Sequence, residues 1–167
     1  MPFTPYHFGP SGFIGLVFRK WLDIPVFVLA NVIVDVEVLV VRLLDAGWPI
    51  HRYIHSLLIG AAAGIAWAMA AWPMRNLFKK IMQILLIPYQ TSFLKMLVSG
   101  VLGVWLHVVI DSIYHRDVSL FWPNRELRPL YKLVTTQQVE MICAILFIWV
   151  LILYIMMVIK ALEKNKV

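Results

Sequence analysis

The sequence predicts an all-α polytopic membrane protein that forms a single membrane-embedded domain over residues 1–167. Hydrophobic residues make up 62% of the chain and the mean hydropathy is +0.82, which is far too apolar for a soluble domain of this size. Four segments also hold the roughly 20 mostly apolar residues that a membrane-spanning helix needs. They cover about 24–44, 54–72, 92–114 and 138–160, with Trp21, Trp48, Trp72 and Trp122 near their ends as interfacial aromatics.

The N-terminal part of the chain predicts one short helix before the first span. The apolar run at 12–18 is too short to cross a membrane, and it follows the turn-forming GPSG at 9–12. We expect a re-entrant or interfacial helix that places His7 against the bundle. No basic region precedes this run, so we expect no cleavable signal peptide. In the span at 24–44, the alternating valines would also suit a strand, but a lone strand in lipid leaves its backbone unsatisfied, which favours a helix.

The later elements follow from local pattern. The span at 54–72 contains Gly60 and Gly64 in a GxxxG arrangement, which lets helices approach closely but also arises by chance in an Ala-rich helix. Residues 76–88 are amphipathic and carry two lysines, as is typical of a helix on the membrane surface. The spans at 92–114 and 138–160 complete the predicted fold.

The positive charge of the chain indicates membrane topology rather than nucleic-acid binding. The net charge is +6, and most basic residues flank the apolar spans, so we expect no nucleic-acid partner. With four spans, the N-terminal segment, the 73–91 loop and the C-terminus share one side, and their basic residues make that side cytoplasmic. The 45–53 and 116–137 loops lie on the other side, although the second of these is also basic.

Histidines and acids recur at metal-ligand spacing. His107, Asp111 and His115 stand at successive i, i+4 positions, and His51 and His55 form a second such pair. Residues four apart on a helix have Cβ atoms about 5–6 Å from each other, so each neighbouring pair can hold one ion. His107 and His115 are about 12 Å apart along a helix axis, which makes Asp111 a candidate bridge between two ions. The two clusters are predicted to converge near one membrane face.

Two intramembrane acids complete the candidate set. Asp35 and Glu37 point to nearly opposite faces of a helix, so only one is expected to join the site, and Asp35 is the predicted ligand. Glu37 is a second ligand, a general base or a partner for Arg42. His115 is equally compatible with a solvated helix cap. The predicted metal-ligand set is His7, Asp35, Glu37, His51, His55, His107, Asp111 and His115. This set favours zinc, one to three ions, and leaves Mn²⁺ or Fe²⁺ open.

These motifs resemble a known family, the small bacterial inner-membrane proteins labelled predicted membrane-bound metal-dependent hydrolases, whose best-known member is LexA-regulated. The resemblance rests on TPYHFG, VDVE, HRYIHS, HVVID and HRDVSLFWP, and covers about residues 3 to 125. Here the acid pair lacks a preceding proline, and HRYIH stands where HRGxTH is commoner. The order of His, Asp, His and HxxxD is also similar to the helical zinc phospholipase C and P1 nuclease group, which implies a lipid phosphoester substrate.

The sequence therefore predicts an integral inner-membrane, metal-dependent hydrolase that acts on a membrane lipid or lipid-linked phosphoester through a metal-activated water. Glu37, as general base, and Asp35 are the predicted catalytic acids, and Arg52 or Arg116 is predicted to bind a phosphate headgroup. The alternative interpretation, which the sequence favours, is that both arginines are ordinary interfacial cations. The alternative functions are a metal or proton transporter, a metal-binding membrane scaffold, or a bis-histidine haem protein. The chain is also compatible with a homo-oligomer.

Overall fold

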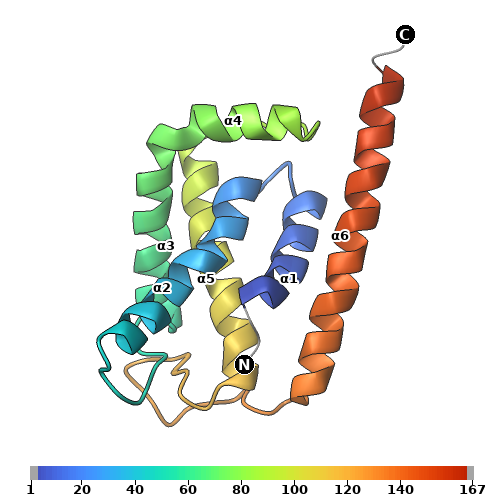
Figure 1. The fold of residues 1–167 in the computed structure, drawn as a ribbon. Helices are drawn as coiled ribbons and strands as arrows, with labels where there is room; N and C mark the ends of the chain where they lie inside the picture. Colours follow the sequence, from blue (N-terminus) through green and yellow to red (C-terminus); the bar gives the residue numbers. More distant parts are fainter. Residues whose placement is uncertain (1–3, 165–167) are drawn as a thin grey trace.

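The computed structural model describes residues 4–164, and over this range it is all-helical (Figure 1). The elements are α1 (Thr4–Val17), α2 (Ile24–Leu43), α3 (Leu57–Ala71), the 3₁₀ helix η1 (Trp72–Met74), α4 (Arg75–Ile84), α5 (Phe93–Tyr114) and α6 (Thr136–Lys164). Four stretches are long and apolar enough to cross a membrane: Ile24–Leu43, Leu57–Ile84, Phe93–Tyr114 and Thr136–Glu163. The predicted fold class is confirmed.

The valine-rich segment around the two intramembrane acids is helical. α2 runs without a break through VDVE, so both the strand alternative and a local helix interruption are excluded. The helix begins at Asp23, whose carboxylate accepts the Val26 N–H at 3.2 Å as an N-cap, with Pro25 in the first turn. An unbroken α2 holds Asp35 and Glu37 at fixed positions on one rigid element.

The first helix is longer than predicted. α1 continues through GPSG at 9–12, so the prediction of a turn there is wrong. Close packing explains the difference, because a Cβ added at Gly9 would lie 2.2 Å from the Cys143 carbonyl oxygen of α6. The glycine therefore lets the two helices meet, and tertiary packing outweighs local turn propensity. At 14 residues, or about 21 Å, α1 is too short to span a membrane and lies between α2 and α6 (Figure 1).

Small residues bring the central helices together. A Cβ added at Gly64 of α3 would lie 2.7 Å from the Gly100 carbonyl oxygen of α5, and one added at Gly103 would lie 2.4 Å from the Phe27 carbonyl oxygen of α2. The close approach predicted for the GxxxG motif is therefore confirmed at Gly64. Gly60 faces inward as well, with Val104 at 3.0 Å from the position of its missing Cβ. These crossings fix α5 between α2 and α3.

The amphipathic segment lies across one end of the bundle, roughly perpendicular to α3 and α5 (Figure 1). α4 buries Phe78 and Met82 and exposes Lys79 and Lys80, as expected of a surface helix. The predicted span at 54–72 begins three residues late, at Leu57, because the residues before it form a loop. That loop, 44–56, and the 115–135 loop lie together at the opposite end of the bundle from α4 (Figure 1).

Candidate metal centre

Asp111 lies at the centre of a cluster formed by four histidines. It is on α5, one turn after His107, and its side chain is almost completely buried. The Nε2 atoms of the four histidines point toward its carboxylate. His7 lies 3.2 Å from Oδ1, His107 lies 3.2 Å from Oδ2, and His51 and His55 each lie 3.8 Å from Oδ2. Three segments far apart in the sequence thus meet at one carboxylate.

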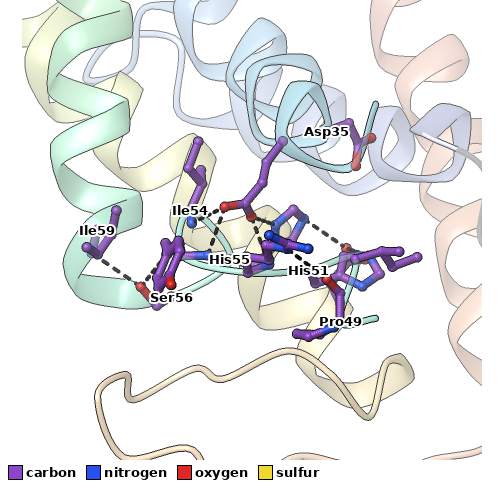
Figure 2. A network of polar contacts seen from close by, with 12 residues as sticks. Asp35, Pro49, His51, Ile54, His55, Ser56 and Ile59 are labelled. Carbon is purple, nitrogen blue, oxygen red and sulfur yellow. Dashed lines mark hydrogen bonds and ion pairs between the residues drawn. The ribbon is translucent and has the colours of Figure 1, made fainter. Parts of the chain in front are cut away.

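The ligand atoms of Asp35, His55, His107 and Asp111, here called the deep group, all lie within 4.8 Å of one another. Asp35 extends from α2 toward the loop histidines (Figure 2), and its Oδ1 lies 3.5 Å from His107 Nε2. The three other members are buried, whereas the Asp35 side chain is 27% exposed. The deep group therefore has one side open to its surroundings.

His7 reaches the deep group from α1. Its ring stacks on His107 with centroids 4.2 Å apart, and the Ser11 hydroxyl donates a hydrogen bond of 2.6 Å to the His7 carbonyl. The expectation that the N-terminal helix tucks His7 against the bundle is therefore met.

His51, His115 and Asp117 form a second cluster, here called the outer group, whose ligand atoms also lie within 4.8 Å of one another. His115 caps the C-terminus of α5 in extended conformation, and its ring lies 4.2 Å from that of His51. As the axial distance predicts, His107 and His115 belong to different groups, and Asp111 lies between them.

The loop that carries His51 and His55 is held in place by two carboxylates. Glu37 Oε1 accepts hydrogen bonds from the backbone N–H groups of Tyr53 and Ile54. Its Oε2 accepts one from the Arg52 backbone N–H and one from Nδ1 of the His55 ring. The four donor–acceptor distances are 2.8–3.0 Å (Figure 2). Residues 51–56 are not helical, so the helical spacing predicted for this histidine pair is wrong. Glu37 instead folds the loop so that His55 Nε2 faces Asp111.

Asp117 has the same role for His51. Its Oδ2 accepts the backbone N–H groups of Ile50 and His51 at 3.0 Å, and its Oδ1 lies 3.0 Å from His51 Nδ1. In both cases a carboxylate occupies Nδ1 and leaves Nε2 directed toward Asp111. Such carboxylate–imidazole pairs orient histidine ligands in metal sites and fix their tautomer.

Hydrogen bonding alone does not satisfy the deep group. Among the described residues, His55 Nε2, His107 Nε2 and Asp111 Oδ1 are buried and have no hydrogen-bond partner, although neighbouring polar atoms lie only 3.2–3.8 Å away. Four ligand atoms about 2.0–2.2 Å from a tetrahedral zinc ion are about 3.3–3.6 Å from one another. A cation placed between these buried polar atoms would supply the partner that hydrogen bonding does not. The residues therefore fit a metal ion.

The ionisation of the loop residues agrees with this arrangement. Burial lowers the pKa of His55 and lowers the pKa of His115 to about 4, so both rings are neutral near pH 7 and can act as ligands. Burial alone would raise the pKa of Asp117, but the hydrogen bonds from the His51 ring and backbone outweigh it and lower that pKa to about 2. The Asp117 side chain is therefore ionised near pH 7.

A cavity of about 440 Å³ opens beside the outer group. Its walls include His51 and Asp117 together with three arginines, Arg52, Arg125 and Arg128. A second cavity of about 420 Å³ shares Asp117 and Arg128 with the first and adds Arg116. Of the two arginines predicted to bind a headgroup, Arg52 therefore lines the cavity that contains His51, and Arg116 lines the second cavity, which contains Asp117.

Three residues of this region were missed by sequence reasoning. Asp117 stands two residues after His115, at a place where the sequence suggests only the end of a helix. Arg125 and Arg128 contribute to the basic charge of the 116–137 loop, and the sequence gives them no further role. The three arginines that follow the HxxxDxxxH motif, Arg116, Arg125 and Arg128, could have indicated an anion-binding site. The contact of Asp117 with His51 depends on the pairing of two loops, in which the two residues are 66 positions apart in the sequence.

Comparison with known proteins identifies the family. A family model described as YdjM inner membrane protein matches residues 15–166. No curated protein and no solved structure matches the chain. The family match covers most of the sequence and agrees with the four helices that can cross a membrane. The chain therefore belongs to the YdjM inner membrane protein family and is an integral inner-membrane protein.

Proposed function

We propose that this protein is a metal-dependent hydrolase that cleaves a lipid or lipid-linked phosphoester at the membrane surface. The observation that supports this proposal most strongly is the deep group, in which two imidazole nitrogens and a carboxylate oxygen are buried without hydrogen-bond partners. Imidazole and carboxylate ligands suit Zn²⁺ first, and Mn²⁺ or Fe²⁺ accept the same set.

The two groups are not equivalent as ion sites. In our proposal, the deep group would bind the first ion through His55, His107 and Asp111, with His7 and Asp35 beside it, which leaves a coordination position for water. The outer group shares Asp111 as a neighbour and binds a second ion more weakly, because His51 Nδ1 and Asp117 are already joined by a 3.0 Å hydrogen bond.

A bound ion of this kind would act as a Lewis acid and would lower the pKa of a water to about 7. In the hydrolysis, the water oxygen forms a bond to phosphorus and the ester oxygen leaves with the electron pair of the broken P–O bond. One proton of the water ends on the alcohol and the other on the phosphate. Asp35, the most exposed member of the deep group, is the acid best placed to receive a proton from the attacking water.

Glu37 has a different role in this proposal from the general base predicted from the sequence. Its two oxygens accept four hydrogen bonds from residues 52–55, so it acts as a positioning residue. It keeps the Nδ1 proton of His55 engaged and the Nε2 lone pair directed at the ion site.

The cationic cavity favours hydrolysis over metal transport. Arg52, Arg125 and Arg128 line the space next to His51, where they attract anions and repel a divalent cation. A pathway that delivers metal ions needs the opposite charge along its wall.

A hydrolysis assay tests the proposal. The purified full-length protein is incubated with lipid phosphoesters in mixed micelles, and phosphate or alcohol release is measured with and without a chelator, then after zinc is restored. We expect release that the chelator abolishes, that zinc restores, and that His55→Ala and Asp111→Ala lose while the exposed loop variant Glu126→Gln keeps it. Chelator-resistant release, or equal rates in all variants, would show that this site is not a metal-dependent hydrolase.

A further inference from the structure

The cavity beside the outer group has the charge of an anion-binding site. It is lined by the guanidinium groups of Arg52, Arg125 and Arg128 and by one carboxylate, that of Asp117. Among residues 4–164, no carboxylate lies within ion-pair distance of any of these three arginines. Asp117 is itself taken up by His51 and the Ile50 backbone. The three arginines thus leave an uncompensated charge of about two positive units.

Two of the three arginines, Arg52 and Arg128, are also held in position. Arg52 Nε donates to the Pro49 carbonyl at 3.0 Å and one terminal nitrogen donates to the Ala46 carbonyl at 2.7 Å. Arg128 Nε donates to the Arg125 carbonyl at 3.1 Å. Guanidinium groups fixed in this way lose less entropy when they bind an oxyanion, and their fork geometry matches phosphate oxygens.

The remaining walls suit a ligand that is anchored in the membrane. Aromatic side chains of Trp48, Tyr53 and Trp122 line the same cavity, and the Trp48 side chain is 69% exposed. All three lie in the two loops outside the membrane-spanning stretches. Tryptophan and tyrosine at span ends are placed at the headgroup level of a bilayer, so the cavity opens where lipid phosphates lie.

We propose that this cavity binds the terminal phosphate of the substrate, and that the substrate class is therefore a phosphomonoester rather than a phosphodiester or a neutral ester. A terminal phosphate carries about −1.5 to −2 charge at pH 7, which matches the uncompensated charge of the three arginines. A diester phosphate carries one negative charge and a neutral ester carries none. His51 and Asp117 line the cavity, so a phosphate bound there lies next to the outer group.

The reaction that follows from this assignment balances without any further reactant. The water oxygen forms a bond to the phosphorus of R–O–PO₃²⁻, and the P–O bond to the ester oxygen breaks. The products are R–OH and HPO₄²⁻. The inference rests on the proposed hydrolase for the role of the cavity, but phosphate binding itself requires no turnover. The two can therefore fail separately.

Binding of a non-hydrolysable probe tests the inference. A dioleoyl lipid with a terminal phosphonate, in which a C–P bond replaces the ester, is offered in mixed micelles to the full-length protein as purified. Dioleoylphosphatidylglycerol and dioleoylphosphatidylcholine serve as diester controls. Bound lipid per chain is counted by native mass spectrometry. We expect the phosphonate lipid to bind at least about tenfold more tightly than either diester, because its second negative charge accepts further charge-assisted hydrogen bonds from the guanidinium groups.

The variants locate the binding. Arg125→Gln and Arg128→Gln should each weaken phosphonate binding about tenfold or more, and Lys79→Gln, which removes an exposed charge at the opposite end of the bundle, should leave it unchanged. Melting temperatures of all variants check that the fold is kept. Equal binding of the three lipids, or an unaffected Arg125→Gln/Arg128→Gln double variant, would overturn the assignment.

A competition with inorganic phosphate identifies the source of the phosphate. If the lipid phosphonate binds much more tightly than inorganic phosphate, the substrate is a membrane lipid. If the two bind alike, the cavity serves a water-soluble phosphomonoester, and the phosphate assignment stands in both cases. Phosphonate binding by a protein that binds no metal would refute the proposed hydrolase, while the assignment of the phosphate-binding cavity would stand. Metal-dependent hydrolysis without a preference for terminal phosphate would do the reverse.

Discussion

Asp111 determines the chemistry of the site at the scale of single residues. It is buried, its Oδ1 has no hydrogen-bond partner among the described residues, and the nearest polar atoms are imidazole nitrogens 3.2–3.8 Å away. A buried carboxylate without hydrogen bonds is costly unless a cation compensates it. The histidines around it are in turn oriented by Glu37 and Asp117, which lie behind them and not among the deep ligand atoms.

Glu37 provides the first test at this scale. In Glu37→Gln, the side-chain amide nitrogen cannot accept the hydrogen bonds that the Arg52 backbone and the His55 ring donate to Oε2. We expect zinc affinity to fall about 10- to 100-fold, measured by competition with a chromophoric chelator. The ¹⁵N spectrum of His55 should show a changed tautomer, which a general loss of stability would not produce. Glu126→Gln is the matched control on an exposed loop position. An unchanged affinity with an unchanged tautomer would remove the positioning role.

At the scale of elements, the site depends on close helix crossings. α5 carries His107 and Asp111, and its position is set by Gly100 against Gly64 of α3 and by Gly103 against Phe27 of α2. Glycine is required there because the backbones themselves are in contact. Any side chain at these positions moves α5 away from α2 and α3 and spreads the ligand atoms apart.

Gly100→Ala tests this packing. Its Cβ would lie 2.3 Å from the Gly64 carbonyl oxygen, so we expect the free energy of unfolding to fall by about 1–3 kcal/mol in a detergent denaturation assay. Gly15→Ala is the control, since its nearest neighbours would lie 3.6 Å or more from the new Cβ. That control should be neutral or slightly stabilising, because alanine is the better helix former. Equal effects of the two substitutions would contradict the crossing geometry.

The far end of the bundle has its own polar anchor. Tyr89 donates a 2.6 Å hydrogen bond to Asp23, and the Thr91 hydroxyl donates to the same carboxylate oxygen. Burial, together with Asp23, raises the pKa of Tyr89 above its ordinary value of 10.0. A raised folded-state pKa stabilises the fold fully below the unfolded value and loses that contribution as the pH rises through the folded value.

The melting temperature of Tyr89→Phe, compared with the wild type across about pH 8 to 11, measures this contribution. We expect the wild type to be the more stable of the two below about pH 10, and the difference to shrink at higher pH. Other alkaline titrations occur in both proteins and cancel in the difference. A difference that stays constant or widens with pH would contradict the assignment of this hydrogen bond.

The elements differ in how far the sequence predicts them. The four spans and the surface helix follow from apolar length and amphipathic pattern, which local sequence determines. The helix through GPSG and the loop at 51–56 depend on tertiary contacts, of Gly9 with α6 and of Glu37 with the loop backbone. The residues proposed as metal ligands, other than Asp117, were candidates from spacing and residue chemistry alone. Asp117, by contrast, becomes recognisable only once the two loops are paired in space.

At the scale of the whole molecule, the two ends of the bundle differ in the use of their charge. At one end, Arg19 and Lys20 lie beside Lys95, whose amino group donates to the Arg19 carbonyl at 3.0 Å. At the other end, three arginines of the two loops line the cavity beside the outer group. The basic 116–137 loop, which weakens the orientation predicted from charge, thus has a proposed binding role of its own. We therefore keep the orientation in which α4 faces the cytoplasm.

Thiol labelling tests this orientation. Cys143, the single native cysteine, is buried, and it is replaced by alanine to give a background without thiols. A cysteine is then introduced for the exposed Glu126 or for the exposed Lys79. A membrane-impermeant reagent added to intact spheroplasts should label the Glu126→Cys protein and not the Lys79→Cys protein. The opposite pattern would place the metal centre on the cytoplasmic side.

The central claim is that Asp111 and the histidines around it bind a metal ion, and bound metal per chain tests it most directly. The protein is purified in detergent and measured by inductively coupled plasma mass spectrometry before and after zinc reconstitution, beside Asp111→Ala, His107→Ala and His115→Ala. We expect at least one equivalent in the wild type, its loss in the Asp111 and His107 variants, and its retention in His115→Ala, which leaves the deep group intact. No bound metal in the reconstituted wild type, or the same content in all four proteins, would contradict it.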